Sequence, residues 1–248
     1  RVLSLHEDMK ELDDNIQSPQ GPHIALKRLE GDGLAIDDLC IAEPSGRVLI
    51  EGLSLHIQRG ERVLINGDPG VTGSLFKVLG GLWPWGSGRV LLPGEREMFF
   101  VAQRPFLPEG ALRDVICYPR MQGACSDEVI IRAMESVGLG RLTARLDEYD
   151  NWEQVLPQRV QQQLGFVRVL LHQPPWVFLE EATDAFDSEG ERQILETLFR
   201  ELPGSTVLNI SFHSDLSPLH HRTLTLNRAG ETKVLFGVRR GQNGNGQH

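Results

Sequence analysis

Residues 62–83 read RVLINGDPGVTGSLFKVLGGLW, and this stretch decides the fold. The apolar run at 63–66 predicts a short buried strand, the glycines that follow it predict a turn, and 75–83 predicts a helix. A strand, a glycine-rich turn and a helix that opens on a hydroxyl residue is the layout of a phosphate-binding Walker A loop. In such a loop, backbone N–H groups and the helix N-terminus hold phosphate oxygens.

The loop lacks the lysine that normally reaches the outer phosphates. Counted from Gly67, the lysine position holds Gly73, and Lys77 lies inside the predicted helix. Any phosphate must therefore be held by the loop itself. The candidate phosphate-binding residues are Gly67, Asp68, Pro69, Gly70, Val71, Thr72, Gly73 and Ser74.

Composition limits the classes of protein to consider. The net charge of −9 argues against a general nucleic-acid binder, because a broad basic surface is missing. The three cysteines show no metal-binding spacing and suit a reducing compartment. The chain contains no apolar run of the roughly 18 residues that a membrane-spanning helix needs. Because it begins at Arg1 without a signal peptide, we expect a piece of a longer polypeptide.

The remaining pattern alternates strands with helices. Stretches 34–42 and 48–57 predict antiparallel strands, and an amphipathic helix at 2–16 precedes a linker at 17–24. Alternation around a phosphate loop predicts a mostly parallel sheet with its ligand at the carboxyl ends of the strands. The other predicted strands are 98–103, 176–181 and 205–212, the helices are 126–139, 160–171 and 189–202, and a hairpin covers 222–226 and 232–236.

Three stretches resemble the nucleotide-binding domain of ATP-binding-cassette (ABC) transporters. They are LGGLWPWGSGRV (79–90), FVAQRPFLPEGALRDVICYP (100–119) and LLHQPPWVFLEEATDAFD (170–187). The resemblance covers nearly the whole chain after residue 33. It is strongest toward the branch that holds peroxisomal acyl-CoA transporters and bacterial SbmA/BacA-like transporters with fused ATPase domains.

The resemblance implies an α/β fold of the P-loop NTPase type: a RecA-like, mostly parallel sheet, an antiparallel β subdomain and a helical signature subdomain at about 104–170. Residues 1–33 would be a helix and linker from a preceding transmembrane domain, 34–240 the cassette, and 241–248 a disordered tail. The implied cofactors are ATP and Mg²⁺. The implied partners are a transmembrane domain of the same or another chain and a second cassette in a head-to-tail dimer, at the cytoplasmic face of a membrane, with the bacterial inner membrane favoured over the peroxisome.

The same resemblance assigns roles to residues outside the loop. Glu181 would activate the attacking water, and Gln103 would sense the metal and the membrane partner as a second catalytic residue. The implied metal ligands are Ser74, Gln103 and Glu180. Glu180 stands where the family has a shorter aspartate, which would crowd the metal.

Several positions depart from the family pattern. The loop is one residue short when counted back from Trp83, which puts Thr72 in the lysine position. In the signature segment 156–161, Pro157 and Arg159 replace serine and glycine; we expect Arg159 to be a solvated helix-start residue rather than a substitute cation. The position of the switch histidine holds Phe212, and we expect the adjacent His213 to be a surface residue.

These departures predict a transporter ATPase domain in which ATP hydrolysis is weak or lost. Two alternatives stay open. One is a non-catalytic cassette that serves as a binding or dimerisation module. The other is an engineered variant that keeps the fold and not the activity.

Overall fold

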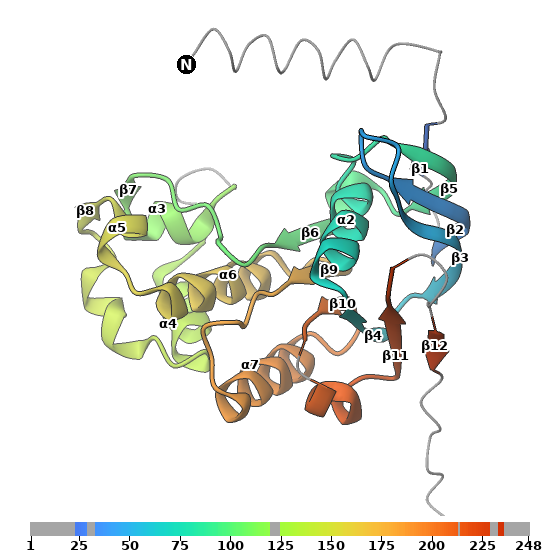
Figure 1. The fold of residues 1–248 in the computed structure, drawn as a ribbon. Helices are drawn as coiled ribbons and strands as arrows, with labels where there is room; N and C mark the ends of the chain where they lie inside the picture. The colour runs from blue at the N-terminus through green and yellow to red at the C-terminus, as the bar shows by residue number, and fades with distance from the viewer. Residues whose placement is uncertain (1–22, 29–32, 120–124, 213, 229–232, 236–248) are drawn as a thin grey trace, which may run out of the picture.

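The computed structural model describes residues 23–28, 33–119, 125–212, 214–228 and 233–235, which form two sheets and the helices around them (Figure 1). The predicted helix at 2–16, most of the predicted linker, His213 and the tail at 241–248 lie outside these residues.

The larger sheet has six strands in the order β12-β11-β4-β10-β9-β6. Neighbouring strands run parallel except β12, which is antiparallel to β11. The predicted mostly parallel α/β architecture is therefore confirmed. The strands are β4 (Arg62–Gly67), β6 (Met98–Val101), β9 (Trp176–Glu180), β10 (Thr206–Ile210), β11 (Arg222–Leu226) and β12 (Lys233–Leu235).

The smaller sheet has four strands in the order β1-β5-β2-β3. They are β1 (Ala25–Arg28), β2 (Gly33–Ala42), β3 (Val48–Gln58) and β5 (Gly86–Leu92). The predicted pair of antiparallel strands is present as β2 and β3. β1 lies within the stretch expected to be helix and linker, yet it pairs with β5 in parallel, so the described part of that stretch belongs to this sheet.

Helices pack on the larger sheet, and several of them form a separate group at one side of it. In Figure 1, α2 stands between the two sheets, α3, α4 and α5 gather beyond the β6 edge together with the short strands β7 (Gly110–Ala111) and β8 (Tyr149–Asp150), and α6 runs from this group to the larger sheet. The helices are α2 (Pro69–Leu79), α3 (Leu112–Cys117), α4 (Asp127–Ser136), α5 (Trp152–Val155), α6 (Gln158–His172) and α7 (Ser188–Glu201).

Strand β9 divides the hydrophobic core in two. Because successive side chains of a strand point to opposite faces, Val177 and Leu179 join a cluster with α6 and α7, while Trp176 and Phe178 join a cluster with α2 and the smaller sheet. All four are at most 1% exposed, and burying each of the aliphatic or phenyl side chains contributes about 1.5–3 kcal/mol. This packing fixes the position of β9, and the carboxyl end of the strand leads into Glu180 and Glu181.

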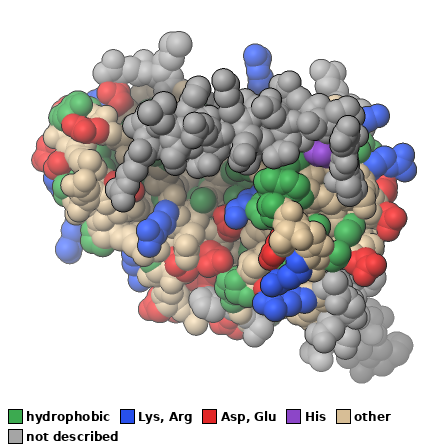
Figure 2. Space-filling view, turned by 45° about the horizontal axis from the view of Figure 1, so that its top comes forward, with side chains coloured by type: hydrophobic (Ala, Val, Ile, Leu, Met, Phe, Trp, Pro, Cys, Tyr) green, Lys and Arg blue, Asp and Glu red, His purple; other side chains and the backbone are tan. Residues whose placement is uncertain are grey.

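The surface is polar and mixed in sign. On the face in Figure 2, acidic and basic side chains alternate over the coloured part of the chain, with small hydrophobic groups between them. Among the described residues, no helix combines the length and the apolar character needed to cross a bilayer.

Candidate functional site

The predicted site residues follow parallel strands that end at one edge of the larger sheet. Gln103 comes two residues after β6, Glu180 ends β9, and the candidate phosphate loop follows β4. The structure brings Gln103 and Glu181 together, since Gln103 Nε2 lies 3.2 Å from Glu181 Oε2. This pair therefore has the proximity that its implied roles require.

The turn at 180–187, which we call the acid turn, is held by backbone contacts. Glu181 has a φ of 47°, a left-handed conformation that few residues other than glycine adopt. Its N–H donates to Ile210 O at 2.9 Å, which ties the turn to the end of β10. The Glu181 side chain is consequently directed at the edge of the sheet where Gln103 lies.

Asp184 is the centre of a polar network that the sequence did not reveal. Its carboxylate accepts hydrogen bonds from Gln103 Nε2 at 2.7 Å, from Gln158 Nε2 at 3.1 Å and from Gln162 Nε2. Gln162 is fully buried, and its Oε1 accepts the Ala185 N–H at 3.2 Å. The network joins the β6 end, the start of α6 and the acid turn.

Burial and neighbouring negative charges raise the pKa of Glu180 and of Glu181. The pKa of Glu180 is raised, first by burial and then by the charge of Glu181, against a smaller opposite effect of Lys77. The pKa of Glu181 is raised by burial and by the charge of Asp184. In both cases the low-dielectric surroundings and a like charge favour the neutral acid.

The start of α2 differs from the prediction. The helix begins at Pro69, five positions before Ser74, and ends at Leu79 rather than at Trp83. Pro69 at the first helical position has the φ that a helix needs, and Asp68 caps the helix with its side chain. Most of the stretch that was expected to form a loop around phosphate is therefore the first turns of a helix.

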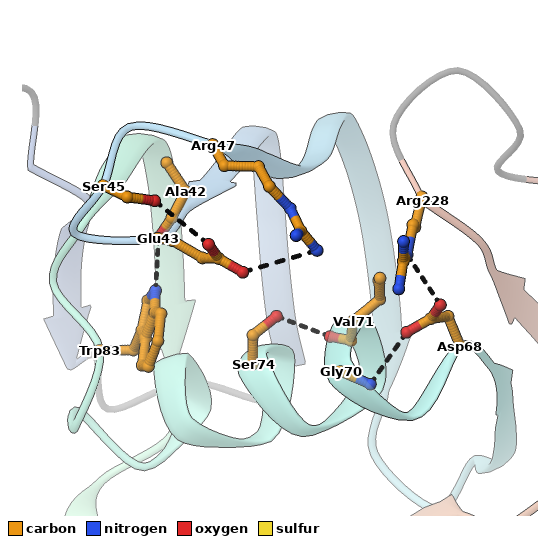
Figure 3. Close-up of polar contacts among 10 residues, drawn as sticks. All are labelled: Ala42, Glu43, Ser45, Arg47, Asp68, Gly70, Val71, Ser74, Trp83 and Arg228. Carbon is orange, nitrogen blue, oxygen red and sulfur yellow. Dashed lines mark hydrogen bonds and ion pairs between the residues drawn. The ribbon is translucent and has the colours of Figure 1, made fainter.

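Every backbone N–H from Asp68 to Thr72 has a partner within the chain. Asp68 N donates to Leu226 O at 2.9 Å, Pro69 has no N–H, and Val71 and Thr72 both donate to Asp68 O at 3.0 Å. The remaining N–H, that of Gly70, donates to Asp68 Oδ1 at 3.0 Å. The other carboxylate oxygen, Oδ2, lies 3.0 Å from Arg228 Nε (Figure 3).

The two hydroxyl groups of this segment also bond to the backbone. Thr72 Oγ1 donates to Asp68 O at 3.2 Å, and Ser74 Oγ donates to Val71 O at 2.7 Å. Both side chains are buried, at 0% and 4% exposure. As it stands, the start of α2 does not fit the phosphates and Mg²⁺ that the resemblance implies, because a carboxylate of the chain takes the anion position and Ser74 faces a carbonyl.

Gly67 and Gly73 are explained by packing. Gly67 has a φ of 133°, and a Cβ there would lie 1.8 Å from Leu226 O, so β11 requires a glycine at this position. Gly73 lies inside α2, and a Cβ there would lie 3.3 Å from Glu180 Oε1. The helix thus passes directly beside the first acid of the acid turn.

The segment aligned with the family signature contacts its own chain. α6 begins at Gln158, after Pro157, which provides no side-chain cap. Arg159 is half exposed, as expected, but it also pairs with Asp187, with Nη1 3.7 Å from Oδ1, and its guanidinium lies 4.7 Å from the centre of the Phe186 ring. In this structure Arg159 braces the acid turn.

The position predicted for the switch histidine, Phe212, lies just after strand β10. β10 ends at Ile210, and Phe212 is 40% exposed. Before it, Ser211 Oγ donates to the buried Glu191 carboxylate at 3.1 Å, which also accepts from Thr183 Oγ1 at 2.6 Å. These bonds hold the acid turn against β10 and α7.

A cavity of 430 Å³ lies beside the β6 edge. Its lining includes Phe100, Pro105, Phe106, Tyr118 and Arg168. Phe106 is 61% exposed and meets Tyr118 edge to face at 5.8 Å. The segment that carries Gln103 thus continues directly into an apolar hollow on the surface.

Comparison with known proteins finds relatives among ABC transporters and their ATP-binding proteins. The chain is 32% identical over 199 residues to an uncharacterized ABC transporter ATP-binding protein of Haemophilus influenzae, and the match covers 80% of this chain and 33% of that protein. It is 33% identical over 222 residues to ABC transporter D family member 1 of Arabidopsis thaliana, covering 84% and 16%. It is 34% identical over 216 residues to the human lysosomal cobalamin transporter ABCD4, covering 81% and 35%. The chain thus spans about a third or less of the length of these relatives.

A solved structure confirms the fold. A bacterial Atm1-family ABC exporter with ATP bound matches with a TM-score of 0.72 and 21% identity, over 90% of this chain and 43% of that one. No protein-family model matches the chain.

Proposed function

We propose that this chain, a homologue of ABC transporter ATP-binding proteins, is the nucleotide-binding domain of a membrane transporter, with ATP hydrolysis far below that of an intact site. In this proposal ATP and Mg²⁺ are the cofactors, Glu181 and Gln103 are the catalytic candidates, and Gly67–Ser74 is the phosphate-binding segment. Gln103 and Glu180 remain candidate metal ligands, and Ser74 would join them only after its hydroxyl leaves Val71 O.

The contact between Gln103 and Glu181 carries this proposal. Two groups that follow strands far apart in sequence meet at the carboxyl edge of a parallel sheet, 3.2 Å apart, and the neighbouring Glu180 lies against Gly73 of α2. Ligands of such sheets bind at this edge. The covered amino end of α2 and the missing lysine support slow hydrolysis, because one lost preorganised charge donor typically costs about 10²–10³ in rate.

Two measurements test the proposal. Mg-ATP should raise the melting temperature of the chain, and at about 100 times Kd it adds about 2.7 kcal/mol of stability. Phosphate release should be slow yet above that of a Glu181→Gln variant. Turnover equal to that of the variant would favour a non-catalytic cassette, and no thermal shift at millimolar ATP would contradict nucleotide binding.

The second candidate, a binding or dimerisation module, is favoured by the start of α2. Its N–H groups and hydroxyls are all used within the chain. A module of this kind would form a dimer whose dissociation constant, measured by analytical ultracentrifugation, is unchanged by Mg-ATP. The ATP-driven cassette dimer would instead tighten when nucleotide is added.

The cavity beside β6 supports a membrane domain as partner. Its exposed Phe106 and Tyr118 suit an apolar helix end, and it adjoins the Gln103 segment. The chain would then lie at the cytoplasmic face of a membrane, with the bacterial inner membrane favoured. Crosslinking from a cysteine at position 106 in the assembled transporter tests this contact, and a cysteine at exposed Tyr149 is the control.

A further inference from the structure

The contact between Asp68 and Arg228 brings together two segments that are far apart in sequence. Asp68 follows β4, and Arg228 follows β11, the parallel neighbour of β4 in the larger sheet. The two segments are also joined by the bond from Asp68 N to Leu226 O and by the close approach of Gly67 to Leu226. The position of the Asp68 carboxylate is therefore fixed by the sheet as well as by the helix it caps.

The carboxylate satisfies the groups that would otherwise attract an anion. Oδ1 takes the Gly70 N–H, and Oδ2 takes the guanidinium of Arg228, which is 66% exposed. Helix N-termini favour negative charge, so a carboxylate here is stabilised by the same dipole that would stabilise phosphate. A second anion at this place would meet a negative charge instead of free donors.

We propose that Asp68 is a built-in anion that competes with phosphate at the start of α2, so that nucleotide binds only after this carboxylate has been displaced. The inference rests on the proposed function and identifies Asp68 as the residue that lowers the affinity of the site for phosphate. Arg228 holds the competing carboxylate, and once Asp68 has been displaced the same guanidinium becomes a donor for phosphate.

Asparagine is the informative replacement at position 68. It caps helices as well as aspartate does, so Asp68→Asn keeps the bond to Gly70 and removes only the charge. The ion pair lost with Arg228 is mostly exposed and adds little to stability. The variant is therefore expected to fold.

Asp187 provides a matched control. It caps α7, its Oδ1 accepts the Gly190 N–H at 3.0 Å, and it has an arginine partner in Arg159. Asp187→Asn thus makes the same chemical change at the start of another helix. A general effect of helix ends would appear in both variants.

The test is calorimetric titration of the 248-residue chain with inorganic tripolyphosphate and separately with Mg-ATP. Asp68→Asn should bind tripolyphosphate roughly tenfold more tightly or better than the parent chain, since one charge repulsion is removed. Asp187→Asn should stay within about twofold of the parent, and adding Arg228→Gln to Asp68→Asn should remove the gain. Equal affinities in Asp68→Asn and the parent would overturn the inference and leave the proposed function standing. A gain for tripolyphosphate without any binding of Mg-ATP would support the inference and contradict the proposed nucleotide.

Discussion

Gln103 Nε2 lies 2.7 Å from Asp184 Oδ2 and 3.2 Å from Glu181 Oε2, so one amide group bridges two carboxylates. Carboxylate oxygens that are ionised only accept hydrogen bonds, which fixes the orientation of the amide and turns its Oε1 away from both acids. Gln158 and Gln162 present their amide groups to the same Asp184. These amide groups attach the start of α6 to the acid turn, in addition to the ion pair between Arg159 and Asp187.

Asp184→Ala should loosen the start of α6. Three amide groups lose their acceptor, and we expect a loss of about 1–2 kcal/mol in the free energy of unfolding. Hydrogen exchange of the first turn of α6 should accelerate. Glu189→Ala is the matched control, because Glu189 also accepts from a glutamine amide, that of Gln193 at 2.7 Å, on an exposed face of α7. Equal protection of α6 in both variants would show that Asp184 does not anchor this helix.

Gly73→Ala should stabilise the chain. Gly73 lies inside α2, where alanine is favoured over glycine by about 0.5–1 kcal/mol. The new methyl group would meet only Glu180 Oε1, the end of a flexible side chain, at 3.3 Å. Gly67→Ala should instead destabilise strongly, because its Cβ would overlap Leu226 O. Urea denaturation measures both; a destabilised Gly73→Ala would mean that this segment is a glycine-dependent loop rather than a helix.

His220 should make the stability depend on pH between about 4 and 6.5. Burial lowers the pKa of His220 to about 4, with smaller effects of the charges on Arg62 and His221 against a raising effect of the bond to Leu216 O. Nε2 has no hydrogen-bond partner among the described residues. As the pH falls below 6.5, His220 is protonated in the unfolded chain but stays neutral in the folded chain. The free energy of unfolding therefore falls. At pH 4 the loss in the free energy of unfolding is about 3 kcal/mol.

His220→Asn should flatten this pH dependence, because its amide can replace Nδ1–H as donor to Leu216 O, 2.9 Å away, without titrating. Urea denaturation at pH 7 and pH 5 provides the comparison. His56→Asn, on the exposed side of β3, should leave the contribution of His220 in place. An unchanged slope in His220→Asn would contradict this assignment.

Arg168→Lys should destabilise the chain despite keeping the charge. Arg168 is 6% exposed, and its guanidinium donates to Val115 O at 2.6 and 3.0 Å and to Phe106 O at 2.7 Å. Lysine is a point donor and cannot reproduce this fork, so we expect a loss of about 2–3 kcal/mol. Arg192→Lys is the control, since Arg192 makes exposed ion pairs on α7 that are worth well under 1 kcal/mol. Similar losses in the two variants would refute this role for Arg168.

The sequence predicted the parallel sheet and placed Gln103 and Glu181 at the ends of two of its strands, because apolar strands and the residues that end them have a clear pattern. β1 and β5 escaped prediction. β5 begins Gly86-Ser87-Gly88, which reads as a turn, but both glycines have positive φ and pass so close to the backbone of β2 that a side chain would not fit. The need for glycine at these two positions comes from the neighbouring strand β2, so the residues around them in the sequence do not reveal it.

The error at α2 has a different cause. Gly67, Gly70 and Gly73 read as a loop, whereas Asp68 and Pro69 form a helix start that the same letters also permit. The bonds to Leu226 and Arg228 decide between the two, and both residues lie about 160 positions away. Asp184 was missed for a similar reason, since the letters ATDAFD do not show which amide groups converge on it.

Gly165 links the surface hollow to the acids. A Cβ on Gly165 would lie 3.0 Å from Val101 Cγ1 and 3.8 Å from Pro105 Cβ, so α6 rests on the strand and on the segment that flank Gln103. Gly165 also lines the hollow together with Phe106, so an occupant of the hollow would contact α6 directly. The same helix carries Gln158 and Gln162, so an occupant that shifted α6 would also move two of the amide groups that bind Asp184.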